Sequence, residues 1–270
     1  MLRVEKDGLV WYTLASYAGL PVVHGAFTRL GGYSRPPFAD LNVGGHVGDD
    51  PAAVAANHRA IYAALGVDPA RVVSARQVHG DRVARVDAAD VGRTLEATDA
   101  LITDTPGILL LLRFADCVPV WLYDPRHHAV GLAHAGWQGT ARCIAAKTAC
   151  AMGEAFGSRP EEIVAGIGPA IGPCCYEVGA DVIEALRVVV ADVDALLSDR
   201  STDTARLDLW QANAVQLGAV GVSHIETAGL CTSCHVDAFY SHRREEGRTG
   251  RFAVVAGLEA GLGAGPEASS

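Results

Sequence analysis

The stretch FADCVPVWLYDPRHHAVGLAHAGWQGT, residues 114–140, contains two apolar runs joined by a turn. The runs VPVWLYD and HAVGLAHAG are almost unbroken in apolar residues, which is typical of strands that are buried on both faces. Cys117 lies just before the first run, and His134 lies near the end of the second. We therefore expect a pair of strands that carries a thiol and an imidazole at its ends, where a site can form.

Outward from this pair, the apolar pattern predicts a mixture of helices and short strands. Asp50 and Pro51 begin a helix that Gly66 ends, because Asp caps helices, Pro fits their first turn and Gly terminates them. A turn at Gly80-Asp81 separates predicted strands over 71–79 and 83–88. Further strands are expected over 100–104, 107–116, 118–124, 128–136, 161–168 and at the end of 231–258, and further helices over 141–156 (capped by Thr140), 180–190 and 207–221. The chain is therefore predicted to be an α/β protein with its sheet inside and its helices outside.

Length and composition indicate one domain with a large core. The chain has 270 residues, of which 50% are hydrophobic and 20% are charged. No repeat, linker or change of composition divides it before residue 258, so we expect residues 1–258 to form a single domain. Residues 259–270 are mostly small and polar and are predicted to be a disordered tail.

The charge and the apolar runs limit the partners and the location. The formal net charge of −9 argues against nucleic acid and against anionic membranes, because both bind basic surfaces. The charged opening MLRVEKDGLVWY does not fit a signal peptide, and the longest apolar run, 108–112, is too short to span a bilayer. We therefore expect a cytoplasmic protein, either a monomer or a small homo-oligomer, whose seven cysteines are thiols or metal ligands.

Several cysteine and histidine motifs have simpler explanations than a site. CTSCH at 231–235 matches the pattern of c-type haem attachment, but that attachment occurs in exported proteins, and no thioredoxin-like unit surrounds the pair. His224-Ile225-Glu226 imitates the zinc-deaminase signature, yet Leu230 replaces its proline and the spacing to Cys231 is too short. Cys174-Cys175 lies in a Gly/Pro-rich loop, and adjacent cysteines do not easily bind one metal, while His127-His128 fits a solvated turn. These cysteines are expected to be free thiols.

Three segments remain as a candidate site, around His79 in RQVHGD, Cys117 in FADCVP and His134 in LAHAGWQGT. Each candidate ends or closely follows an apolar strand, and the ends of neighbouring strands converge in space. Two imidazoles and one thiolate suit zinc, with a fourth position open for water or substrate. Spacing alone is equally compatible with a buried cysteine beside two hydrogen-bonded core histidines, and with a Cys117 nucleophile that has a histidine as its base.

These segments closely resemble the laccase-domain family, the YfiH- and YlmD-like proteins first described as multicopper polyphenol oxidases. The family patterns Q-x-H-G, A-D-C-x-P and H-A-G-W-[RQ]-G-T are matched at 77–80, 115–119 and 134–140. Further matches are LNVGGHVGDDP at 41–51, IGPAIGPCCYEV at 167–178 and FYSHRREEGRTGR at 239–251. The resemblance thus runs in order from about residue 20 to about residue 256.

The resemblance implies a four-layer α/β/β/α sandwich with mixed sheets and one zinc ion held by His79, Cys117 and His134. It also implies a purine nucleoside phosphorylase that uses phosphate to cleave adenosine, inosine and methylthioadenosine, with adenosine deaminase activity. Copper is the second candidate metal, because copper-dependent polyphenol oxidation has also been assigned to the family, although a multicopper oxidase needs many more ligands than these three. Some relatives are described as Cys/His amidases that edit peptidoglycan precursors, and a non-catalytic metal-binding module is equally compatible with the three ligands.

Two residues are the candidates for catalysis. Cys117 is either a metal ligand or a nucleophile. Asp116 beside it is the nearest carboxylate that can move protons, or else a strand-end residue bonded to the backbone.

The candidates for substrate binding lie on several segments. Gly139 and Thr140 at a predicted helix N-terminus offer N–H groups to phosphate or an oxyanion. Most members of the resembled family have Arg where this chain has Gln138, which keeps hydrogen bonds but loses charge. The remaining candidates are Arg59 and Arg243 for phosphate or ribose, and Asn42 and Gln77 for a purine edge or a ribose hydroxyl.

Overall fold

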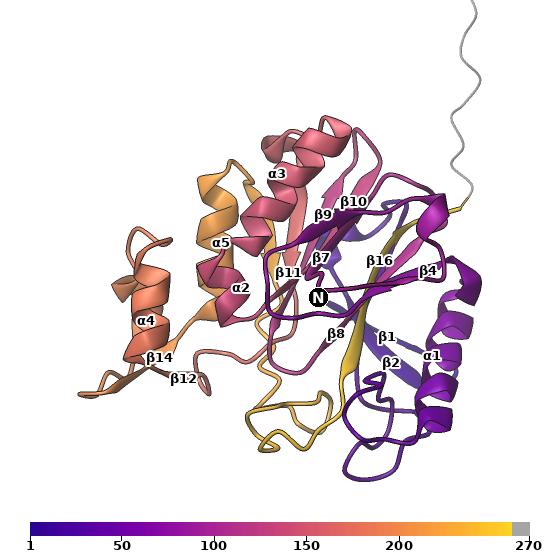
Figure 1. Ribbon diagram of the computed structural model, residues 1–270, viewed down its shortest axis with the longest axis horizontal. Coiled ribbons are helices and arrows are strands. Elements are labelled where there is room, and N and C mark those ends of the chain that lie inside the picture. Colours follow the sequence, from indigo (N-terminus) through magenta and orange to yellow (C-terminus); the bar gives the residue numbers. More distant parts are fainter. Residues whose placement is uncertain (261–270) are drawn as a thin grey trace, which may run out of the picture.

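The computed structural model describes residues 1–260 of the chain. Two large mixed sheets lie face to face, with helices on their outer sides (Figure 1). The predicted α/β architecture with mixed sheets is confirmed. The tail predicted for 259–270 lies, from residue 261 onward, outside the described residues.

The first sheet has seven strands in the order β1-β2-β3-β16-β8-β4-β6. Neighbouring strands are antiparallel from β1 to β8, and the last two pairs, β8 with β4 and β4 with β6, are parallel. Its strands are β1 (Leu2–Lys6), β2 (Leu9–Thr13), β3 (Val22–Phe27), β4 (Val72–Ala75), β6 (Thr94–Leu95), β8 (Leu109–Phe114) and β16 (Phe252–Leu258).

The second sheet has six strands in the order β15-β11-β9-β10-β7-β5. The predicted strand pair of residues 114–140 lies at its centre as the antiparallel β9 and β10, with Ala135 opposite Val118 and His134 opposite Pro119. The strands are β5 (Val83–Arg85), β7 (Ala100–Thr103), β9 (Val118–Asp124), β10 (Ala129–Ala135), β11 (Val164–Ile167) and β15 (His224–Thr227).

The predicted helix after Asp50 is confirmed as α1 (Pro51–Leu65). The Asp50 side chain accepts the N–H of Ala52, and Gly66 ends the helix in the left-handed conformation with φ of 68°.

The predicted helix over 141–156 is wrong at its start, because Cys143, with φ of 59°, divides it into two helices. Thr140 therefore caps nothing and lies inside the first of these, with its hydroxyl bonded to the carbonyl of Gly136. The other helices are α2 (Trp137–Ala141), α3 (Ile144–Phe156), α4 (Ala180–Arg187) and α5 (Leu209–Ala219), with 3₁₀ turns at Ala15–Tyr17, Pro69–Arg71, Ala88–Asp90, Pro160–Glu162 and Asp194–Leu196.

The alternation of side chains along β8 and β9 produces four layers. Leu109 and Leu111 of β8 pack in the same cluster as Ile61 of α1, whereas the alternating Leu110 and Leu112 face the other sheet. On β9, Leu122 packs toward α3 and α5, whereas Trp121 faces the first sheet. Because both sheets are covered on both faces, their central strands are apolar almost throughout. The order is α1, first sheet, second sheet, then α3 and α5, as the resemblance implied.

One side chain links the two sheets directly. The indole N–H of the fully buried Trp121 on β9 donates to the carbonyl of Val255 on β16 at 2.8 Å.

A third, three-stranded sheet packs with α4 at the edge of the sandwich (Figure 1). Its strands are β12 (Glu177–Gly179), β13 (Leu197–Ser198) and β14 (Thr204–Leu207). Within residues 1–260, no helix has the length and apolar character needed to cross a membrane.

Candidate metal centre

Two connections between the large sheets each carry a candidate ligand. The chain leaves the first sheet after β4 and reaches β5 of the second through a loop that contains His79. It leaves the first sheet again after β8 and enters β9 through a short turn that ends at Cys117. His134 lies on β10, beside the start of β9. The ligand atoms of these three residues, here called the ligand triad, all lie within 4.8 Å of one another.

A buried carboxylate orients one imidazole of the triad. Asp99 is fully buried, and its Oδ1 lies 3.0 Å from Nδ1 of His134. Its two oxygens also accept the N–H groups of Val78, His79 and Gly80 at 3.1, 2.9 and 2.8 Å. Burial alone would raise the pKa of Asp99, but these hydrogen bonds outweigh it and lower the pKa. The ionised carboxylate thus leaves Nε2 of His134 free for a metal, as carboxylates behind metal-binding histidines do.

The Cys117 thiol and the His134 imidazole stabilise each other as charged groups. Burial alone would raise the pKa of Cys117, but His134 and His79 lower it to about 6. Burial alone would lower the pKa of His134, but Cys117 and Asp99 raise it to about 9. Thiolate is the form of cysteine that binds metals, and a bound metal would displace the proton that the raised pKa keeps on His134.

The shape of the triad fits a zinc ion. Ligand atoms around tetrahedral zinc lie about 3.3–3.8 Å apart, because Zn–N and Zn–S bonds are about 2.0–2.3 Å long. The limit of 4.8 Å on the triad is compatible with this spacing. Gly136 leaves the necessary room, since a Cβ there would meet Sγ of Cys117 at 2.8 Å and Cδ2 of His79 at 3.2 Å. Two imidazoles and one thiolate leave one tetrahedral position for another group.

Asp116 holds the turn that ends at Cys117. Its backbone lies in the left-handed region with φ of 85°, which is uncommon for a residue other than glycine. Its Oδ1 accepts the hydroxyl of Thr232 at 2.6 Å, and its Oδ2 accepts the backbone N–H of Arg243 at 2.7 Å. Both oxygens are therefore engaged, which favours a structural role for Asp116 over proton transfer.

The triad opens into a cavity of about 1020 Å³. Arg113, Arg243 and Arg251 line it, so the cavity offers several positive charges beside the candidate metal. Tyr176 and Trp137 add aromatic surface, and Arg243 lies over the ring of Tyr176 at 5.3 Å.

Arg251 lies close to the triad. Burial lowers the pKa of Arg251, and the charges that oppose this shift are those of Cys117 and Asp116. The guanidinium group is therefore within electrostatic reach of the thiolate that would bind the metal.

Two residues predicted to contact substrate instead hold the walls of the cavity. Both amide atoms of Gln77 bond to the backbone of Arg113, at 2.8 and 2.9 Å. Asn42 is fully buried and does not line the cavity. Its Oδ1 accepts the N–H groups of Gly44 and Arg251, so it fixes the loop before α1 to the start of β16.

Four other predicted contacts lie outside the cavity. Arg59 is exposed on α1, and Gln138, Gly139 and Thr140 lie in α2 behind the wall that Gly136 and Trp137 form. Thr140 is fully buried and accepts a bond from the amide of Asn213 at 3.0 Å. The predicted anion site at Gly139 and Thr140 depended on a helix starting there, and the chain starts that helix earlier. Arg243 does line the cavity, as predicted.

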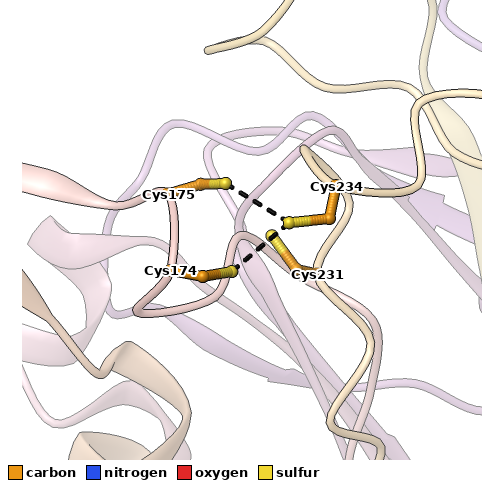
Figure 2. Close-up of side chains that lie close together, drawn as sticks. All are labelled: Cys174, Cys175, Cys231 and Cys234. Atoms are coloured by element: carbon orange, nitrogen blue, oxygen red, sulfur yellow. Dashed lines mark hydrogen bonds between the residues drawn. The ribbon is translucent and has the colours of Figure 1, made fainter.

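A second cluster of candidate ligands has no counterpart in the sequence-based predictions. Cys174, Cys175, Cys231 and Cys234, here called the cysteine cluster, have sulfur atoms within 4.8 Å of one another (Figure 2). They are free thiols, as expected. The expectation that the adjacent pair would not contribute to a shared site is wrong in its geometry, because the loop of 174–175 faces the loop of 231–234.

The two adjacent histidines lie in a turn, as predicted, with His128 exposed and His127 half-buried. The sequence favoured a solvated turn for His127 and His128. Nδ1 of His127 lies 2.7 Å from the buried carboxylate of Asp124, so this imidazole is anchored to the end of β9.

Comparison with known families and proteins gives a consistent result. The family described as multi-copper polyphenol oxidoreductase laccase matches residues 23–259. A protein of Geobacillus stearothermophilus named purine nucleoside phosphorylase YlmD is 42% identical over 263 residues, which cover 94% of this chain and 96% of that protein. A protein of Bacteroides thetaiotaomicron named purine nucleoside phosphorylase is 35% identical over 271 residues, covering 96% and 98%.

Solved structures show the same fold. The crystal structure of YlmD from Geobacillus stearothermophilus has a TM-score of 0.91 at 38% identity, covering 95% of this chain and 98% of that one. The crystal structure of the hypothetical protein YfiH of Bacillus licheniformis has a TM-score of 0.89 at 39% identity, covering 94% and 98%.

Proposed function

The chain belongs to the multi-copper polyphenol oxidoreductase laccase family, and from this membership and the cavity around Cys117 we propose that it is a zinc-dependent purine nucleoside phosphorylase. The proposed substrates are phosphate and adenosine, inosine or methylthioadenosine, and the products are the free base and a ribose 1-phosphate. The relatives named for this activity support the proposal.

The observation that carries the proposal is the coexistence of the ligand triad and four arginines, Arg113, Arg243 and Arg251 together with Arg76, in the lining of one cavity. A volume of about 1020 Å³ lies at the upper end of the range for small-molecule sites and has room for a nucleoside together with phosphate. Guanidinium groups bind phosphate through charge-assisted hydrogen bonds. A purine can pack against Tyr176 and Trp137, the aromatic side chains of the lining.

The residues of the chain have separate tasks in this reaction. The triad would hold zinc, which when bound supplies Lewis-acid polarisation of the substrate. Arg251 and Arg243 position phosphate toward C1′ of the ribose, where the new C–O bond forms as the bond to the purine breaks. Burial raises the pKa of Tyr176, so its hydroxyl keeps its proton and can donate a hydrogen bond at neutral pH. Asp116 acts as a positioning residue, through its bonds to Thr232 and to the backbone of Arg243.

We include adenosine deaminase activity in the proposal, because the same ligand triad suits the activation of water. Zinc held by three protein ligands with one open position is the usual arrangement for hydrolytic chemistry. In this reaction water replaces the amino group at C6 of the purine, and ammonia leaves. The two activities differ in their need for phosphate, so they can be measured separately in one preparation.

The test is chromatography of the products formed from adenosine with and without phosphate. Without phosphate, we expect inosine and ammonia; with phosphate, we expect adenine and ribose 1-phosphate in addition to the products of deamination. Cys117→Ala removes a ligand and should abolish both reactions together with one equivalent of zinc. Wild-type turnover by that variant would contradict the proposal. The matched control is Cys150→Ala, because Cys150 is exposed on α3 and lies outside both clusters.

An amidase with Cys117 as nucleophile is the second candidate, because two imidazoles lie beside this thiol. Iodoacetamide separates the two functions when zinc is present. A zinc-bound thiolate is protected, whereas a catalytic nucleophile reacts. Labelling of Cys117 at the rate of the exposed Cys150 would favour the amidase, and protection of Cys117 would favour the phosphorylase. Oxidation of a phenol that requires added copper and is absent with zinc would instead support a polyphenol oxidase.

A further inference from the structure

The four sulfur atoms of the cysteine cluster come from two loops that are far apart in the sequence. Cys174 and Cys175 lie in the loop before β12, and Cys231 and Cys234 lie in the loop after β15. In Figure 2 the four side chains point toward one centre. Sγ of Cys234 lies 3.4 Å from Sγ of Cys174 and 3.5 Å from Sγ of Cys175.

Backbone bonds bring the two loops together without help from the thiols. Ala170 and Cys231 form an isolated parallel bridge, and the N–H of Thr232 donates to the carbonyl of Ala170 at 3.0 Å. The N–H groups of Cys175 and Tyr176 both donate to the carbonyl of Gly172 at 2.9 Å, which turns the first loop toward the second. The four sulfurs thus meet because the surrounding backbone places them there.

We propose that the cysteine cluster binds one zinc ion as four thiolates, in a site separate from the ligand triad. In a tetrahedral zinc site with Zn–S bonds of about 2.3 Å, the sulfur atoms lie about 3.8 Å apart. The cluster, with all its sulfurs within 4.8 Å of one another, already approaches that spacing. Binding replaces four S–H bonds by four Zn–S bonds and releases the protons to solvent.

Four soft thiolates around one centre select zinc or iron–sulfur chemistry. An iron–sulfur cluster spreads its four cysteines over two or four iron atoms and so needs a wider arrangement than this one. The N–H of Gly172 also donates to Sγ of Cys231 at 3.2 Å, and such bonds to ligand atoms orient the ligands of metal sites. These features favour a single tetrahedral ion.

The location of the cluster suits a structural ion. None of its four residues lines the cavity. Cys174 and Cys234 are exposed, so an ion can enter from solvent, whereas Cys231 is buried. Thr232 in the second loop bonds to Asp116, and Tyr176 next to the first loop lines the cavity. A bound zinc would therefore fix the two loops that support the wall of the cavity, without contact with substrate.

The test measures zinc per chain by elemental analysis after saturation and desalting. Wild type should retain two equivalents. Cys174→Ser/Cys234→Ser should lose one of them and keep the other at the triad, whereas Cys143→Ser/Cys150→Ser, which changes the two cysteines outside both clusters, should keep both. Retention of two equivalents by the Cys174→Ser/Cys234→Ser variant would overturn the proposal.

A second measurement uses the unaltered protein, so its result does not depend on whether the double variant folds. Alkylation followed by peptide mass analysis should find Cys174 and Cys234 protected with zinc and labelled after chelation, while exposed Cys150 is labelled in both samples. Equal labelling with and without zinc, or a disulfide between Cys174 and Cys234 in the freshly purified protein, would overturn the proposal. Neither measurement depends on nucleoside turnover, so failure of the phosphorylase assay leaves this test intact.

Discussion

Replacing Asp99 by Asn should weaken zinc binding at the ligand triad and also destabilise the fold. Each carboxylate oxygen of Asp99 accepts two hydrogen bonds, Oδ2 from Val78 and Gly80 and Oδ1 from His79 and His134. An Asn side chain puts N–H donors where one oxygen was, so two of the four bonds are lost whichever way the amide lies. Hydrogen bonds to charged groups contribute about 1.5–3 kcal/mol each, so the free energy of unfolding should fall by about 3–6 kcal/mol.

Zinc affinity should fall because the orientation of His134 depends on the lost carboxylate. Substitution of the group behind a metal-binding histidine typically reduces affinity about 10- to 100-fold. This range corresponds to about 1.4–2.7 kcal/mol. Competition with a chromophoric chelator measures the dissociation constant, and urea unfolding of the metal-free protein measures stability. The titration is done in the Cys174→Ser/Cys234→Ser background, so that zinc at the triad alone is observed.

The matched control is Asp124→Asn. Asp124 is also fully buried, accepts the N–H groups of Arg126 and His127 and lies 2.7 Å from the imidazole of His127, but it lies at the other end of β9. This variant should lose stability and keep the zinc affinity of the wild type. If Asp99→Asn binds zinc as tightly as Asp124→Asn does, the argument that Asp99 orients a ligand is wrong.

Three further predictions concern single residues. Gly136→Ala should lower zinc affinity at least tenfold, because the new Cβ would meet Sγ of Cys117 at 2.8 Å. The loss of stability should be small, because the φ of −70° at this position suits alanine. Competition with a chelator measures the change in affinity. Arg251→Gln should raise the KM for phosphate about tenfold or more, as expected for the loss of one charged hydrogen bond, whereas Arg59→Gln on the outer face of α1 should not change it. Burial alone would raise the pKa of Glu226, but N–H groups of the 3₁₀ turn at 15–17 lower it from 4.5 to about 2. The stability that Glu226 adds is therefore present above pH 4.5 and lost as the pH falls toward 2, and Glu226→Gln should flatten the unfolding free energy over that window in urea titrations.

The central elements were predictable because their local signals agree with their tertiary environment. The helix α1 has a cap, a proline and a terminating glycine at the expected places. The strands β8, β9 and β10 are apolar almost throughout because sheets or helices cover both faces. The first three strands were not predictable in the same way, because β1 is mostly exposed and carries a charged sequence. Its pairing with β2 depends on the register of that hairpin, which periodicity does not reveal.

The candidate site was predictable where a residue type has few other uses, and less so where hydrogen bonding decides. The histidines and the cysteine of the triad stand out at strand ends. The roles of Gln77 and Asn42 were harder to predict, because a side-chain amide can either contact a ligand or form hydrogen bonds with backbone groups. In this protein both side chains bond to the backbone. Arg251 ends the FYSHRREEGRTGR segment, but an arginine at the start of a strand carries no distinct local signal of a cavity residue.

The cysteine cluster escaped prediction because its two halves are far apart in the sequence, with Cys234 59 residues from Cys175 and 60 from Cys174, and are joined only by tertiary contacts. Without the second loop, two adjacent cysteines make a poor ligand pair for one metal. The bridge between Ala170 and Cys231 supplies the missing proximity, and a single sequence gives no sign of it.

The chain crosses from one sheet to the other at His79 and at Cys117, and this affects how the protein unfolds. Two of the three ligands lie on connections between the sheets, so a movement of one sheet away from the other would displace His79 and Cys117 relative to His134. If the triad holds zinc as proposed, separation of the sheets and release of the ion would be coupled, and a chelator should lower the stability of the whole sandwich as well as turnover.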